Sequence, residues 1–117
     1  MKGVVVLVVV LATVAVALAG PAAPRTILIK AREFVFEPKE VTARTGEVTF
    51  DIKNEGAIEH NFVIEDAAQK KVAQIAVIEA GKTEDLKIIL RAGTYALICN
   101  LPGHKDAGMT GTLRVQP

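Results

Sequence analysis

The hydrophobic pattern of the chain changes once, near residue 20. Apolar residues run almost without a break from Gly3 to Leu18, and the remainder of the 117 residues carries short runs in which apolar and polar positions alternate. Alternation with a period of two is typical of strands with one buried face, and glycine and proline stand between most of the runs. The predicted strands are 26–30, 47–53, 61–65, 85–90, 94–99 and 111–115. Short strands at this spacing predict an all-β sandwich or barrel, not a parallel sheet with crossover helices.

One segment leaves two interpretations open. Residues 66–72 contain Ala67-Ala-Gln-Lys-Lys71, which are good helix formers. The same composition also suits a polar loop between two strands. The sequence therefore predicts either a short helix or a loop at this place.

The N-terminal segment has the features of a targeting sequence. Lys2 precedes the apolar run, and Ala17-Leu-Ala19 is followed by Gly20-Pro21. This order predicts a secretory signal peptide over residues 1–19, cleaved before Gly20. The alternative is an uncleaved membrane anchor, because the run is close to the shortest length that spans a bilayer. Membrane association is expected only in that case, and export predicts a periplasmic or other extracytoplasmic location.

The remaining chain, 20–117, is predicted to form a single domain with balanced charge. Without Lys2, the chain has thirteen basic and thirteen acidic side chains, and the sequence shows no basic cluster. A nucleic-acid partner is therefore not expected. The segment contains a single cysteine, which cannot form a disulfide within the chain, although exported proteins commonly have them.

The last twenty residues contain the most informative chemistry. Cys99 is followed by His104 and Met109, and the only other histidine is His60. Thiolate, imidazole and thioether are ligands that copper prefers, and two histidines with one cysteine and a weak axial methionine form a blue-copper site. The sequence therefore predicts one copper ion per chain, bound by these four residues. In a heterologous host zinc is the alternative metal, since cysteine and histidine suit it as well.

Taken singly, each of these residues has an ordinary explanation. A lone cysteine is commonly an inert core thiol, and a lone histidine commonly just satisfies a hydrogen bond. Met109 alone would be core filler, and His104 alone a solvated loop residue. All four occur together in the order and spacing of one metal site, which favours copper ligation.

The same residues resemble the cupredoxins, the blue-copper family of plastocyanin and azurin. The resemblance covers about residues 25–117 and rests on the following segments: Phe34-Val-Phe-Glu-Pro38, Val41-Thr-Ala-Arg-Thr-Gly46, His60-Asn61-Phe62, Gly93-Thr-Tyr95, Cys99, Pro102-Gly103-His104, Gly108-Met109 and Gly111-Thr-Leu113. It implies a Greek-key β-sandwich or barrel of about seven to eight strands. The gap from Cys99 to His104 is longer than is usual in plastocyanins, and the gap from His104 to Met109 is longer than in azurins, so no single subfamily is indicated.

The resemblance also implies roles for individual residues. Cys99, His60 and His104 would be equatorial ligands and Met109 the axial ligand, while Asn61 would pin the ligand-bearing loops together. His104 would be the electron port. It would be ringed by small and apolar residues: Leu101, Pro102, Gly103, Ala107 and Gly108.

We therefore expect an exported electron carrier that docks transiently with redox proteins near His104. The alternative is a copper storage or delivery protein of the periplasm. An enzyme is not expected, because a multicopper oxidase or nitrite reductase needs further histidines and a binuclear copper site needs a second cysteine.

Overall fold

The computed structural model describes residues 1–17 and 25–117, and the second range forms nine strands. The strands are β1 (Arg25–Arg32), β2 (Val35–Glu37), β3 (Glu40–Arg44), β4 (Gly46–Asn54), β5 (His60–Glu65), β6 (Lys71–Ile78), β7 (Thr83–Leu90), β8 (Gly93–Ile98) and β9 (Thr110–Gln116). All six strands predicted from the sequence are present.

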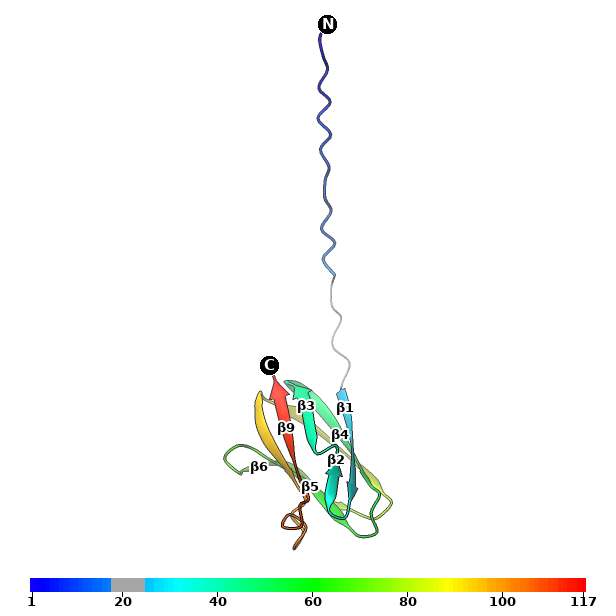
Figure 1. Ribbon diagram of the computed structural model, residues 1–117, viewed down its shortest axis with the longest axis vertical. Helices are drawn as coiled ribbons and strands as arrows, with labels where there is room; N and C mark the ends of the chain where they lie inside the picture. The colour runs from blue at the N-terminus through cyan, green and yellow to red at the C-terminus, as the bar shows by residue number, and fades with distance from the viewer. Residues whose placement is uncertain (18–24) are drawn as a thin grey trace.

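The strands form two sheets that pack face to face (Figure 1). One sheet has the order β2-β1-β4-β7 and the other β3-β9-β8-β5-β6. Both are mixed, because β1 runs parallel to β4 and β3 runs parallel to β9, whereas the other neighbours are antiparallel. The prediction of an all-β sandwich is confirmed.

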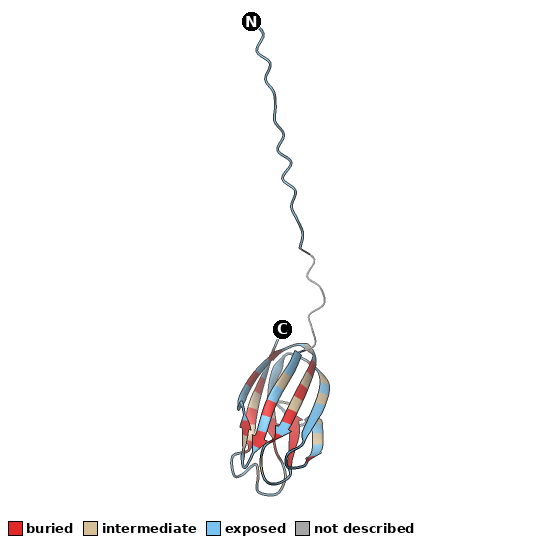
Figure 2. Ribbon diagram, turned by 90° about the vertical axis from the view of Figure 1, so that its right-hand side faces the viewer, coloured by how far each residue is buried: buried red, intermediate tan, exposed pale blue. Residues whose placement is uncertain are grey.

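The core lies between the two sheets and follows the alternation of the sequence (Figure 2). In β4, Val48, Phe50 and Ile52 are buried, while the residues between them face outward or are partly covered. The rings of Phe36 and Phe50 pack on Phe62 at centroid distances of 5.6 and 5.5 Å. These aromatic contacts join the two sheets, because Phe50 belongs to one and Phe62 to the other.

The helix considered for residues 66–72 is wrong, and the loop interpretation is correct. The Asp66 carboxylate accepts hydrogen bonds from the backbone amides of Ala68 and Lys70, both at 2.9 Å. The carboxylate thus stabilises a tight turn, and the pairing of β5 with β6 resumes at Lys71. A helix of so few residues has no comparable source of stability.

The segment before β1 bears only partly on the predicted signal peptide. Residues 1–17 are exposed and contain no helix or strand. Within the described ranges, no helix has the length and apolar character needed to cross a membrane. The predicted cleavage position before Gly20 falls in 18–24, outside the described residues.

Candidate metal centre

Three strand ends and the loop between β8 and β9 bring the four predicted ligands to one end of the sandwich. Cys99 directly follows β8, Met109 directly precedes β9, and His60 is the first residue of β5. β8 pairs with both β5 and β9, so these three residues come from neighbouring strands. The backbone of Met109 is tied to the other ligands, because its carbonyl accepts from the amide of Cys99 and its amide donates to the carbonyl of His104, both at 3.1 Å.

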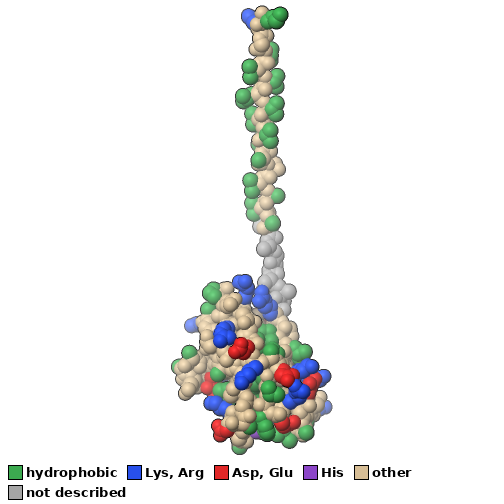
Figure 3. Space-filling model, viewed as in Figure 1, with side chains coloured by type: hydrophobic (Ala, Val, Ile, Leu, Met, Phe, Trp, Pro, Cys, Tyr) green, Lys and Arg blue, Asp and Glu red, His purple; other side chains and the backbone are tan. Residues whose placement is uncertain are grey.

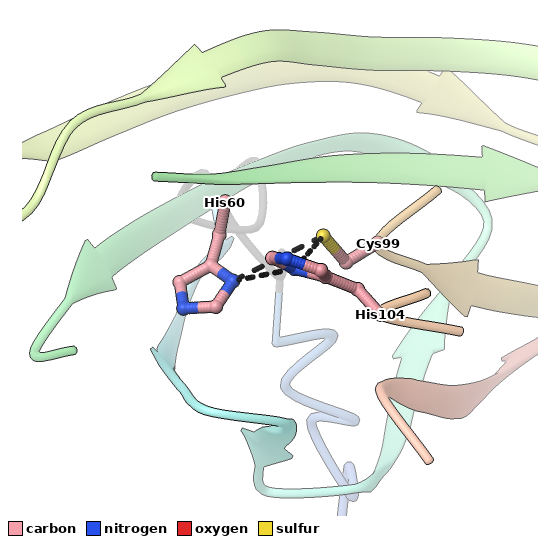
Figure 4. Close-up of side chains that lie close together, drawn as sticks. All are labelled: His60, Cys99 and His104. Atoms are coloured by element: carbon pink, nitrogen blue, oxygen red, sulfur yellow. Dashed lines mark hydrogen bonds between the residues drawn. The ribbon is translucent and has the colours of Figure 1, made fainter. Parts of the chain in front are cut away.

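Three donor atoms of the predicted ligands converge on one point (Figure 4). Nδ1 of His60 lies 3.2 Å from Nδ1 of His104, and Sγ of Cys99 lies 3.3 Å from Nδ1 of His104 and 4.0 Å from Nδ1 of His60. Metal bonds of about 2.0 Å to nitrogen and about 2.3 Å to sulfur place three such donors roughly 3.3–3.8 Å apart around one ion. The spacing therefore fits a single metal ion, and the soft thiolate in the set fits copper.

The centre is closed on the protein side and partly open at one ligand. Cys99, His60 and Met109 have no solvent exposure, whereas His104 is partly exposed. Cys99 and Met109 are also members of the hydrophobic core. Water is thus kept from the sulfur ligands, and the imidazole of His104 is the part of the set that reaches the surface.

Asn61 fastens the strand that carries His60 to the strand that carries Cys99. Its side-chain oxygen accepts from the amide of Asn100 at 2.9 Å, and its side-chain nitrogen donates to Oδ1 of Asn100 at 2.6 Å. Its own backbone amide points at Sγ of Cys99, 3.4 Å away. The pinning role implied by the resemblance is therefore present, and the amide contact stabilises negative charge on the sulfur.

The loop between β8 and β9 is folded on itself by backbone hydrogen bonds. The amide of His104 donates to the carbonyl of Leu101, and the amide of Ala107 donates to the carbonyl of Gly103. Gly103 and Gly108 have φ values of 81° and 108°, which residues with a Cβ rarely adopt. The compact turn sets His104 back toward Cys99.

Asn54 holds the loop that precedes His60. This buried side chain donates to the carbonyls of Ile58 and Ile78 at 2.9 and 2.8 Å, and its oxygen accepts from the amide of Gly56 at 2.9 Å. All its polar atoms are thereby satisfied. These hydrogen bonds fix the loop from 55 to 59 to the end of β6, and the loop in turn fixes the position of His60.

Two further residues at the centre were not predicted from the sequence. Glu33 and Phe34 form the turn between β1 and β2. Oε1 of Glu33 lies 2.9 Å from Nε2 of His60, and the ring of Phe34 meets that of His104 edge-on at 4.9 Å. The pKa of Glu33 is lowered below its usual value, and the hydrogen bond from the backbone amide of Ala57 has the largest effect on it. Desolvation acts in the opposite direction. The sequence assigns neither residue a role at the centre, because these roles arise only when the β1–β2 turn packs beside β5 and the β8–β9 loop.

Proteins similar to this chain include two with copper in their names and a plastocyanin. Copper-resistant cuproprotein CopI of Pseudomonas aeruginosa is 27% identical over 81% of this chain, and its namesake from Rubrivivax gelatinosus is 31% identical over 69%. Chloroplastic plastocyanin of Oryza sativa subsp. indica is 34% identical over 84% of this chain. The matches span 78%, 59% and 67% of these relatives, respectively.

Solved structures show the same fold. Reduced auracyanin from Roseiflexus castenholzii superposes with a TM-score of 0.73 at 27% identity, covering 82% of this chain and all of that one. Auracyanin A of Chloroflexus aurantiacus, a blue copper protein, also gives 0.73, at 25% identity, and covers 80% of this chain and all of its own. The family model of the cupredoxin-like domain matches residues 3–115. With its two-sheet fold and its cluster of soft ligands, this chain belongs to the cupredoxin-like family.

Proposed function

We propose that this chain is an exported mononuclear type 1 copper protein that carries single electrons between redox partners. The observation that carries the proposal is the convergence of two imidazole nitrogens and one thiol sulfur within 4.0 Å of one another, at a buried strand end beside Met109. Copper bound there would supply the one-electron exchange between Cu(II) and Cu(I). A periplasmic or other extracytoplasmic location rests on the apolar run that precedes Gly20.

The contribution of the protein is to keep the ligands in place. Cu(II) and Cu(I) prefer different geometries, so a centre that holds its donors rigidly changes charge with little rearrangement. The Asn61–Asn100 pair and the backbone bonds of Met109 fix the two strands and the loop against one another. The buried surroundings of Cys99 exclude water and protect the thiol from oxidation.

His104 is the proposed route for the electron. It is the partly exposed ligand, and apolar side chains lie around its end of the molecule. Exposed Pro102 and Ala107 belong to its own loop, and Phe34 is in contact with its ring. Such a surface suits brief docking with a redox protein, because electron-transfer complexes use small interfaces and dissociate quickly.

Copper storage or delivery is the second candidate function. Two relatives carry the name copper-resistant cuproprotein, which fits a role in copper handling. A store that exchanges copper readily is better served by exposed, labile ligands, whereas three of the four ligands here are fully buried.

Both histidines and the one cysteine belong to this centre. We infer that the chain catalyses no reaction on a substrate.

The visible absorption spectrum of the protein tests the proposed function. Protein recovered from the periplasm should show an intense thiolate-to-Cu(II) band after it is loaded with copper and oxidised. Mass spectrometry of the same protein identifies its N-terminus and so tests export with cleavage. Cys99→Ser should abolish the band by removing the thiolate. Met109→Leu should keep it and shift the reduction potential, because the axial bond is long and weak. A wild-type protein without the band, or a Cys99→Ser variant that keeps it, would contradict the assignment.

A further inference from the structure

The carboxylate of Glu33 is bonded to the side of His60 that faces away from the metal centre. Oε1 of Glu33 lies 2.9 Å from Nε2 of His60 and also accepts from the backbone amides of Ala57 at 3.0 Å and Ile58 at 3.2 Å. Oε2 has one longer contact, at 3.2 Å, with the same amide of Ala57. The side chain of Glu33 is 31% exposed, whereas that of His60 is fully buried. One oxygen atom thus joins a candidate ligand, the β1–β2 turn and the loop before β5.

This contact decides which nitrogen of His60 is available to a metal. An ionised carboxylate only accepts hydrogen bonds, so Nε2 of His60 must carry the proton that it donates. In a neutral imidazole the other nitrogen then has a free lone pair. That other nitrogen is Nδ1, the atom that lies 3.2 Å from Nδ1 of His104 and 4.0 Å from Sγ of Cys99.

We propose that Glu33 is a positioning residue: it holds His60 as an Nδ1 ligand, and its negative charge favours Cu(II) over Cu(I) at the centre. The first half depends only on the contacts of the protein, and the second half rests on the proposed function. Carboxylates bonded to the distal nitrogen of a ligating histidine orient the ring and raise its basicity. A negative charge one imidazole away from the ion stabilises the more positive oxidation state.

The backbone opposite Glu33 is shaped to admit the carboxylate. A Cβ atom on Gly56 would lie 2.1 Å from Oε1 of Glu33 and 2.8 Å from its Cδ. Any side chain at position 56 would therefore push the carboxylate out of its place. Ala57 and Ile58 are exposed, so water can replace the carboxylate at their amides in a variant, whereas His60 is buried and has no such substitute.

Two substitutions separate the charge of Glu33 from its hydrogen bond. In Glu33→Gln the amide oxygen still accepts from Nε2 of His60, but the charge is gone. The reduction potential should rise by about 59 mV, which corresponds to about a tenfold change in the preference between the two oxidation states. In Glu33→Ala the acceptor is lost as well, and copper affinity should fall about 10–100-fold. Gly56→Ala, which displaces the carboxylate without removing it, should also lower the affinity.

Glu59→Gln is the matched control. Glu59 is exposed and adjacent to His60 in the sequence, and the described contacts include no hydrogen bond between its carboxylate and the ring. The substitution removes the same charge from the same end of the molecule. Its potential should move by much less than that of Glu33→Gln, and its copper affinity should stay at the wild-type value.

The metal-free protein gives a readout that does not depend on electron transfer. Long-range proton–nitrogen NMR spectra should show His60 protonated at Nε2 in the wild type and in Glu33→Gln, and a mixture of both tautomers in Glu33→Ala. Wild-type tautomer and affinity in Glu33→Ala would overturn the positioning role. Equal shifts of potential in Glu33→Gln and Glu59→Gln would overturn the charge role. Failure of the proposed function has a different signature, namely a wild-type protein without the thiolate-to-Cu(II) band.

Discussion

At the scale of single residues, buried amide side chains set the positions of the ligands. Asn54 and Asn61 are both buried, and each satisfies its polar atoms with partners on a different segment of the chain. If one partner of a buried hydrogen bond is removed, the other polar group stays buried without a partner, and the full desolvation penalty of that group is lost from the stability of the protein. Such residues therefore contribute to stability and also fix the geometry of the loops that they join.

Asn54→Ala should destabilise the protein by about 1–3 kcal/mol, because the buried carbonyl of Ile78 loses its side-chain donor and the amide of Gly56 loses its acceptor. The free energy of unfolding is best measured by urea titration of metal-free protein, since bound metal adds its own stabilisation. Gln74→Ala, at an exposed position of β6, should change stability by less than about 0.5 kcal/mol. Equal effects of the two substitutions would contradict the bridging role of Asn54.

Residues with distinctive chemistry were predictable, and residues defined only by tertiary contact were not. Cys99, His60 and His104 are rare residue types in this chain, so their spacing alone pointed to one cluster. Glu33 is one of many acidic residues and lies 27 positions before its partner His60. The sequence marks Phe34 only as part of a segment that resembles the cupredoxins and gives it no role of its own. Its contact with His104 depends on how the β1–β2 turn packs against the β8–β9 loop.

At the scale of elements, the predictable strands are those with regular alternation. The segment 47–53 alternates strictly between polar and apolar residues and lies within β4. This strand is paired with β1 on one side and β7 on the other. β6 was not predicted, because its sequence Val72-Ala-Gln-Ile-Ala-Val77 lacks a clear period of two and follows a stretch of helix formers. Its register with β5 shifts between His60 and Phe62, so the irregular pattern has a structural counterpart next to the metal centre.

The pairing of β4 with β7 brings two like charges together. Asp51 lies directly opposite Asp85 in the register, and the hydrogen bond between their carboxyl groups, together with desolvation and repulsion, raises the pKa of Asp51. Neighbouring lysines are engaged elsewhere, since Lys53 pairs with Glu55 and Lys87 pairs with Glu47. Within residues 1–17 and 25–117, no salt bridge joins either aspartate to a basic side chain.

This arrangement should make the protein less stable as the pH rises above the ordinary aspartate pKa of about 3.9. A raised pKa means that the folded state binds more protons than the unfolded state in that range, so stability falls until the raised pKa has been passed. Asp51→Asn should remove this dependence and stabilise the protein at pH 7 by roughly 0.5 kcal/mol.

Urea unfolding of the metal-free protein measures this effect. The pH should be varied from about 4, near the ordinary aspartate pKa, to about 7. Glu47→Gln is the control, because it removes an acidic group from the same strand but one that lies 3.8 Å from Lys87. It should give no stabilisation. If Asp51→Asn were no more stable than wild type at pH 7, repulsion across β4 and β7 would not be a significant term.

At the scale of the whole molecule, the loop between β8 and β9, which carries His104, and the C-terminus lie at opposite ends of the sandwich (Figure 1). β9 begins beside Met109 and ends at Gln116, so it spans the distance between them. Basic and acidic side chains are interspersed over the face seen in Figure 3, which agrees with the near balance of charge in the sequence. Charges of both signs thus lie on this face, and apolar contact near His104 is the proposed basis of docking.

The docking surface distinguishes an electron carrier from a copper store. Ala107→Glu or Pro102→Glu places a charge beside His104 at an exposed position of the β8–β9 loop. Two molecules that exchange an electron through this surface would have to desolvate and oppose the new charges, so self-exchange should slow by about tenfold and become faster with added salt. Gln116→Glu, the same charge change at the far end of β9, should leave the rate unaltered.

The measurement is the self-exchange rate from NMR line broadening in mixtures of oxidised and reduced protein, with a copper competition titration on each variant. A carrier that uses His104 predicts slow exchange at wild-type copper affinity in both loop variants. Wild-type exchange rates in both would contradict the proposed port. A loss of copper affinity in Ala107→Glu alone would show that its backbone bond to Gly103 had been disturbed, and Pro102→Glu, whose position makes no such bond, would then decide the question.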